Sequence, residues 1–322
     1  MELLPRGQMP TTLRRCSNCG EAEKGSQKLK RCAGCEYVTY CSKLCQKSAW
    51  PDHKSSCQYM SQTLKSHYLQ YDPEVRPFGF ANSQAFTRAL DDWMEAHLWS
   101  LQTCTQAFVL GAGGVEFIKL PPLYMMSFEL VCHMTPEWTT EERNPTHIFT
   151  IQQEGFMKIS DWKDSHPTHV QFWEDAAPVE DELLSMLMQE RHGSAFACLM
   201  CTQFNCDGVT LANTKNFPIL HVRGPLPLDE PSLDIVQDGY TLCLDMITWG
   251  FALRTIEGGD AKTPVPGRYT RRGRKWVWEP LFADWDEYSP TSNEYRDLHM
   301  ALSRQRKTQL SPKQLLNALQ AL

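Results

Sequence analysis

Hydrophobic positions between residues 86 and 108 recur every three or four residues. They are Phe86, Leu90, Trp93, His97, Leu101, Cys104 and Phe108. This spacing places them on one face of a helix, and the run Gly111–Gly114 is typical of a helix end. Near the C-terminus, Ser311 and Pro312 form a good helix start, and Leu315, Leu316 and Leu319 follow on one face. Residues 311–322 are therefore predicted to form a C-terminal helix.

Other segments between these helices have the apolar and β-branched character of strands. Strands are expected near 126–134, 147–159, 194–204 and 217–222, a helix near 181–190, and either type over 241–256. Elements of both kinds in irregular order predict an α+β domain over residues 79–310. The proline- and glycine-containing stretch Tyr71–Phe80 marks its N-terminal boundary.

Composition and charge divide the chain into two units. The 322 residues are 42% hydrophobic, which fits a globular protein and excludes bulk disorder. We find no apolar stretch long enough for a membrane span and no secretory signal. Residues 1–58 hold 10 basic and 5 acidic side chains, whereas residues 59–322 hold 22 and 33. A basic N-terminal unit and an acidic larger unit are therefore expected.

The N-terminal unit is rich in cysteine. Seven of the 13 cysteines lie between Cys16 and Cys57. In a reducing compartment, the cytoplasm or the nucleus, such density indicates metal ligands rather than disulfides. With one histidine they form four pairs: Cys16 with Cys19, Cys32 with Cys35, Cys41 with Cys45, and His53 with Cys57. Eight ligands make two closed tetrahedral shells, so we expect two structural Zn²⁺ ions.

These four pairs can share two ions in two ways. A sequential arrangement joins the first pair to the second and the third to the fourth. An interleaved arrangement joins the first to the third and the second to the fourth. Both give one shell of four cysteines and one of three cysteines with a histidine. Ligand counting does not choose between them.

The order of the pairs, ending in YCSKLCQKSAWPDHKSSC, resembles the MYND-type zinc finger over residues 16–57. The resemblance implies the interleaved, cross-braced arrangement, and we place the finger at residues 12–58. It also implies a protein-interaction module that binds short proline-containing peptides, extended beside its small hairpin. Gln46 and Trp50 stand at positions where the family commonly has Gln and Trp. The strand predicted over Glu36–Tyr40 would offer free backbone groups to such a peptide.

We therefore expect a small cross-braced two-zinc finger followed by an α+β domain, similar to MYND-containing proteins of fungi. The expected function is an intracellular protein-interaction adaptor, which we favour over an enzyme. Some MYND proteins are lysine methyltransferases with a SET domain. Here only 15 residues precede Cys16 and no Asn-His dipeptide occurs, so we expect no SET domain.

Two other functions stay open. One is an enzyme of unidentified class in residues 79–310, with the finger recruiting its substrate. The other, which we favour less, is a nucleic-acid-binding regulator that contacts phosphates through the basic residues of the finger. These are Arg14, Arg15, Lys24, Lys28, Lys30, Arg31, Lys43, Lys47 and Lys54.

We expect no third metal site in the larger unit. Cys198, Cys201 and Cys206 lie close together in the sequence, with His192 nearby. Apolar neighbours place these cysteines in a strand, where free cysteine behaves as a small hydrophobic residue.

Overall fold

The computed structural model describes residues 16–21, 29–35, 38–119, 121, 123–139, 142–167, 170, 196–222, 227–256, 263–273, 275–304 and 306–322. Its helices are α1 (Lys43–Leu69), α2 (Asp72–Val75), α3 (Ser83–Ala96), α4 (Leu98–Gly111), α5 (Val115–Lys119), α6 (Ile159–Ser165), α8 (Glu230–Thr248), α9 (Arg296–Leu302) and α10 (Pro312–Ala321). Short 3-10 helices are η2 (Arg76–Phe78), η4 (Trp285–Glu287) and η5 (Asn293–Tyr295). The strands are β1 (Lys30–Arg31), β2 (Thr39–Tyr40), β3 (Tyr124–Cys132), β4 (Phe149–Lys158), β5 (Phe196–Cys206), β6 (Val209–Leu220), β7 (Ala252–Arg254), β8 (Val265–Arg272) and β9 (Lys275–Pro280).

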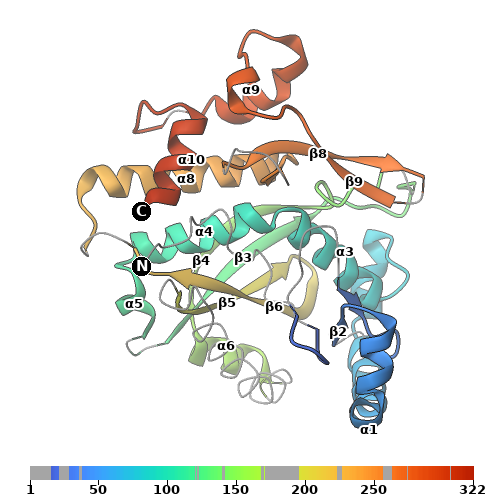
Figure 1. Ribbon diagram of the computed structural model, residues 1–322. Coiled ribbons are helices and arrows are strands. Elements are labelled where there is room, and N and C mark those ends of the chain that lie inside the picture. The colour runs from blue at the N-terminus through green and yellow to red at the C-terminus, as the bar shows by residue number, and fades with distance from the viewer. Residues whose placement is uncertain are drawn as a thin grey trace.

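A four-stranded sheet in the order β4-β3-β5-β6 forms the centre of the larger unit. β3 runs parallel to β5, and the other two pairings are antiparallel. Helices α4 and α8 lie over one face of this sheet, and α6 lies at the other (Figure 1). A second, three-stranded sheet in the order β7-β8-β9 follows α8. The α+β fold expected from the sequence is confirmed.

Aromatic side chains fill the space between the central sheet and its helices. Phe128 of β3 and Phe204 of β5 are fully buried and stack with their ring centroids 5.5 Å apart. Trp93 of α3 is also fully buried and meets Phe204 edge-on at 6.2 Å. Such aromatic pairs add stabilisation beyond that of their buried area. The core therefore fixes α3 against the two parallel strands.

The long helix predicted around residues 86–108 is two helices. α3 ends at Ala96 and α4 begins at Leu98, because His97 leaves helical geometry with φ −99° and ψ 16°. The His97 ring is fully buried, with Nε2 3.3 Å from the carbonyl oxygen of Thr146. Burial lowers its pKa to about 3, although the hydrogen bond to Thr146 opposes this shift. The hydrophobic period continues across the break, which hides it in the sequence.

Several other elements differ in extent from their predictions. The ambiguous segment 241–256 contains the end of α8 and the short strand β7, separated by a turn in which Gly250 has φ +71°. β6 begins at Val209, well before the expected residue 217, because Gly208 at φ +77° closes a hairpin with β5. The helix expected near 181–190 lies outside the described residues. No helix in the described parts of the chain is long and apolar enough to cross a membrane.

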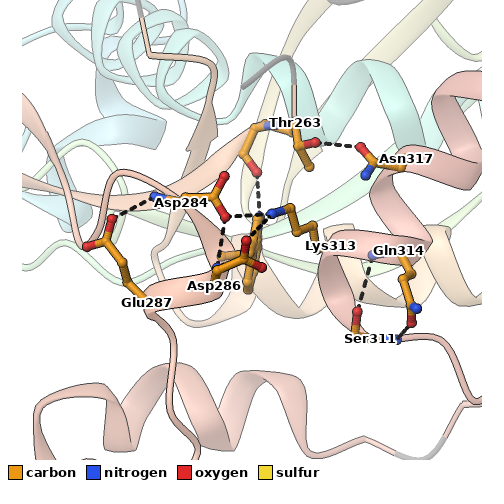
Figure 2. Close-up of polar contacts among 10 residues, drawn as sticks. Thr263, Asp284, Asp286, Glu287, Ser311, Lys313, Gln314 and Asn317 are labelled. Carbon is orange, nitrogen blue, oxygen red and sulfur yellow. Dashed lines mark hydrogen bonds and ion pairs between the residues drawn. The ribbon is translucent and has the colours of Figure 1, made fainter. Parts of the chain in front are cut away.

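The C-terminal helix is tied to the larger unit by its side chains (Figure 2). Ser311 caps α10 in a reciprocal capping box with Gln314. The Lys313 ammonium lies 2.7 Å from a carboxylate oxygen of Asp284 and 2.7 Å from one of Asp286. Leu315 and Leu316 are fully buried in the main core. The helix predicted from Ser311 and Pro312 is therefore present and packs as part of the larger unit.

The finger is joined to the larger unit by a helix and an ion pair. α1 starts within the finger and continues past the predicted finger limit of residue 58 to Leu69. Tyr71 and Val75, which precede the predicted domain start at residue 79, belong to the main core. The Arg31 guanidinium lies 2.5 Å from the Asp91 carboxylate of α3. The limits 12–58, 79–310 and 311–322 stay predictions.

Asp238 of α8 organises the loop before α10, and its removal should destabilise the fold. The carboxylate is 2% exposed and accepts hydrogen bonds from the amide of Lys307 and from the amide and hydroxyl of Thr308 at 2.6–2.9 Å. Asp238→Ala leaves these donors without their acceptor, so we expect a loss of about 3 kcal/mol in urea unfolding. Asp234→Ala removes only a partly exposed ion pair to Lys307 and should cost less than about 1 kcal/mol. Equal losses would contradict this assignment.

Candidate metal centre

A small hairpin and one helix bring the four ligand pairs together. β1 and β2 pair antiparallel, and the Cys32 amide donates to the Val38 carbonyl at 2.8 Å to close the hairpin. Cys16 forms a parallel bridge with Thr39 on the other side of β2. α1 follows directly and carries Cys45, His53 and Cys57.

The eight side chains lie in two groups. Cys16, Cys19, Cys41 and Cys45 form the first, and Cys32, Cys35, His53 and Cys57 form the second. Within each group all ligand atoms lie within 4.8 Å of one another. This is the interleaved arrangement, and the cross-braced two-zinc fold expected from the sequence is confirmed.

Distances between ligand atoms fit tetrahedral zinc. A tetrahedron with Zn–S bonds of about 2.3 Å has edges of about 3.8 Å. In the first group, the Cys19 sulfur lies 3.7 Å from that of Cys41 and 3.8 Å from that of Cys45. In the second group, the sulfurs of Cys32 and Cys57 are 3.7 Å apart. The Cys35 sulfur and the His53 Nε2 are 3.5 Å apart. Both groups are positioned to bind one zinc ion each.

The thiols of the first group differ widely in acidity. Burial disfavours the Cys16 thiolate, but hydrogen bonds from the backbone amides of Cys41 and Cys19 outweigh it and lower the Cys16 pKa to about 6. The hydrogen bond to the Cys45 thiol raises the pKa of Cys41 to about 12. Without a cation, ionisation of one thiol thus opposes ionisation of its neighbours. A dication removes this conflict because it stabilises all of the thiolates at once.

The second group repeats this pattern. Burial opposes the Cys32 thiolate, yet the backbone amides of Cys35 and Gly34 lower its pKa to about 6. Burial, followed by the hydrogen bond with Cys32, raises the pKa of Cys57 to about 12. Each group therefore combines closed tetrahedral spacing with crowded thiols, as structural zinc sites do.

The described residues hold no third group of metal-binding side chains. Cys198, Cys201 and Cys206 lie on β5, as their apolar neighbours indicated, and do not converge on one point. His192 lies outside the described residues.

Gln46 and Trp50 occupy different environments on α1. The Gln46 side-chain amide lies 3.8 Å from the Cys32 sulfur, so it contacts the second ligand group. Trp50 is 40% exposed and meets the His53 ring edge-on at 6.2 Å. The small core of the finger is built instead from Leu29, Tyr40 and buried cysteines. The Trp50 ring is therefore left on the surface.

The free strand edge expected over Glu36–Tyr40 is partly occupied. Thr39 pairs with Arg31 on one side and bridges to Cys16 on the other. The Ser17 amide donates to the Thr39 carbonyl at 2.9 Å. An added peptide strand therefore finds no free backbone edge at Thr39. Glu36 and Tyr37 lie outside the described residues.

Comparison with known proteins identifies the finger. Residues 16–57 match the family model described as the MYND finger. Over 62 residues the chain is 45% identical to histone-lysine N-methyltransferase SMYD3 of Homo sapiens, which covers 19% of this chain and 14% of that protein. Over 56 residues it is 41% identical to SET domain and MYND-type zinc finger protein 6 of Schizosaccharomyces pombe, 17% of this chain and 11% of the relative. The chain thus carries a MYND finger.

The likeness to these relatives is confined to the finger region. The aligned segment covers 14% of the human protein and 11% of the yeast protein, far less than two thirds of either. A third relative, histone-lysine N-methyltransferase ASHR1 of Arabidopsis thaliana, is 32% identical over 62 residues, 19% of this chain and 12% of the relative. No solved structure matches the chain.

The two ligand groups predict the zinc content of the purified protein. We expect two zinc ions per chain by elemental analysis, because both groups are complete. His53→Ala opens the second shell and should lower the content to about one ion. Cys198→Ser removes a thiol outside both groups and should leave two. A measured content of three ions, or a loss on Cys198→Ser, would revive a site on β5.

Chelation should unfold the finger alone. Its core holds few large apolar side chains, so zinc has to supply the missing stability, on the order of 10–16 kcal/mol for structural sites in peptides. A strong chelator should remove hydrogen-exchange protection from the amides of Ser17 and Cys32. Protection should persist in α3, α4 and β5, which belong to the main core. Loss of protection in both parts together would show that they fold as one unit.

Proposed function

We propose that this protein is an adaptor whose MYND finger binds short proline-containing peptides of partner proteins. In this proposal Cys16, Cys19, Cys41 and Cys45 hold one zinc ion. Cys32, Cys35, His53 and Cys57 hold the other. Because both shells are closed, the ions shape the binding surface and take no part in chemistry. The densely packed free thiols support a reducing location, the cytoplasm or the nucleus.

The exposed ring of Trp50 is the observation that carries this proposal. A tryptophan in so small a unit would normally fill its core, yet here Tyr40 does so at 2% exposure and Trp50 stays 40% exposed. The edge-on contact with His53 holds the ring against the second ligand group. A flat, preorganised indole surface packs well on a proline ring. Gln46, four residues earlier on α1, supports the same surface through its contact with Cys32.

Charged side chains beside Trp50 favour peptides with acidic residues near the proline. Lys43, Lys47, Trp50 and Lys54 follow one another at spacings of four, three and four residues and are all exposed. Such spacings place them on one stripe of α1. A carboxylate next to the proline would therefore meet an ammonium group, which speeds encounter and fixes orientation.

Substitution of Trp50 tests this surface. We expect Trp50→Ala to weaken a peptide selected from an array of ten-residue proline-containing sequences about tenfold, because it removes the main apolar contact. Zinc content should stay at two ions, since Trp50 is not a ligand.

Tyr59 supplies the matched control. It is 68% exposed on the same helix, nine residues after Trp50 and so on the opposite side. Tyr59→Ala should leave the affinity unchanged. An array without hits, or equal losses for both variants, would count against the proposal. Tighter binding of a single-stranded oligonucleotide would favour the nucleic-acid alternative instead.

A further inference from the structure

The hairpin formed by β8 and β9 is a basic segment of an acidic unit. Residues 265–280 hold five basic side chains and one acidic one. The rest of residues 59–322 holds 17 basic and 32 acidic side chains. β8 and β9 are two of the three strands of their sheet, and their hairpin reaches past the end of α8 (Figure 1). A positively charged segment within a negatively charged unit indicates a partner of negative charge.

One of the two edges of β9 has no strand partner among the described residues. In the order β7-β8-β9, β9 is an outer strand. Arg272 pairs with Lys275 next to the turn, and at the other end the Leu281 amide donates to the Pro266 carbonyl at 3.0 Å. Bonded and non-bonded positions alternate along an antiparallel pair. The backbone groups of Trp276 and Trp278 therefore face away from β8, toward the edge that has no partner among the described residues.

The indole rings of β9 are already engaged within the protein. The Trp278 indole N–H donates to the carbonyl of Ala252 at 3.0 Å. The guanidinium of Arg271 lies over the Trp276 ring, 5.4 Å from its centroid. These contacts leave no open stacking platform of the kind that single-stranded nucleic acid requires. What the strand offers is a polar backbone edge and positive charge.

Positive side chains on the hairpin already pair with carboxylates. Arg268 contacts Asp297 at 2.7 Å, and Arg272 contacts Glu279 at 2.5 Å. Lys275 is exposed and makes no ion pair with the described residues.

We propose that β9 is a second docking site, where an extended acidic peptide of a partner protein adds as a strand. Its backbone would pair with Trp276 and Trp278, and a carboxylate at one end of the peptide would lie beside the exposed Lys275. Val277, at 40% exposure, offers an apolar contact on the solvent-facing surface. This site is independent of the finger and of the peptide proposed to bind there.

A labelled twelve-residue peptide, the sequence Glu-Val-Glu-Thr repeated three times, serves as the probe. It has no proline, and its carboxylates alternate with strand-forming residues. Binding to the full-length protein, measured by fluorescence anisotropy, should weaken about fivefold on Lys275→Glu. Lys119→Glu makes the same charge change on an exposed residue at the end of α5 and should leave the affinity unchanged. The same peptide with Lys for Glu should not bind.

Hydrogen exchange distinguishes strand addition from loose electrostatic attraction. Bound peptide should slow exchange at the amides of Trp276 and Trp278, with little change at Val277, which already faces β8. Absence of binding, or insensitivity to Lys275→Glu, would overturn the proposal, as would unchanged exchange at both tryptophan amides. Loss of binding on zinc chelation would place the peptide on the finger instead. Lys275-dependent binding of a twenty-residue thymidine oligonucleotide, tighter than that of the peptide, would identify a nucleic-acid surface.

Discussion

The parallel pairing of β3 with β5 is the constraint on which the larger unit depends. Parallel neighbours require a long connection, so this contact joins segments far apart in the chain. It places Phe128 against Phe204 and gives Trp93 of α3 its packing surface. The position of α3 in turn decides where Asp91 meets Arg31 of the finger. The orientation of the finger thus depends on a pairing made inside the main core.

Within the finger, zinc binding is the constraint on which the rest of the structure depends. Cross-bracing means that neither ligand group is a continuous piece of chain. The pair Cys16 and Cys19 meets the third pair, and the pair Cys32 and Cys35 meets His53 and Cys57 of α1. Half of the finger therefore cannot close a tetrahedral shell by itself. Because the apolar core of the finger is too small to stabilise its fold, the eight ligands and zinc have to do so together, as one cooperative unit.

Features with a local chemical cause could be predicted from the sequence. The four ligand pairs follow from spacing, and the start of α10 follows from Ser311 and Pro312, because caps and knuckles involve neighbouring residues. The choice between the two pairings needed the family resemblance, since both satisfy the same ligand count. The break at His97 could not be predicted, because the hydrophobic period continues across it and the residue that the His97 ring contacts, Thr146, is distant in the chain. The β8–β9 hairpin was also missed, although Gly273 followed by Trp276 and Trp278 at alternate positions was a usable signal.

Helix α1 contributes to both ligand groups and also carries the exposed Trp50. Cys45 belongs to one group, and His53 and Cys57 belong to the other. A ligand that recognises only the folded surface therefore increases the affinity of the chain for zinc. By thermodynamic reciprocity, zinc increases the affinity of the chain for that ligand by the same factor. Binding of a partner and binding of zinc are therefore thermodynamically coupled. Where free zinc is scarce, the abundance of partner would set how much of the finger exists in its folded form.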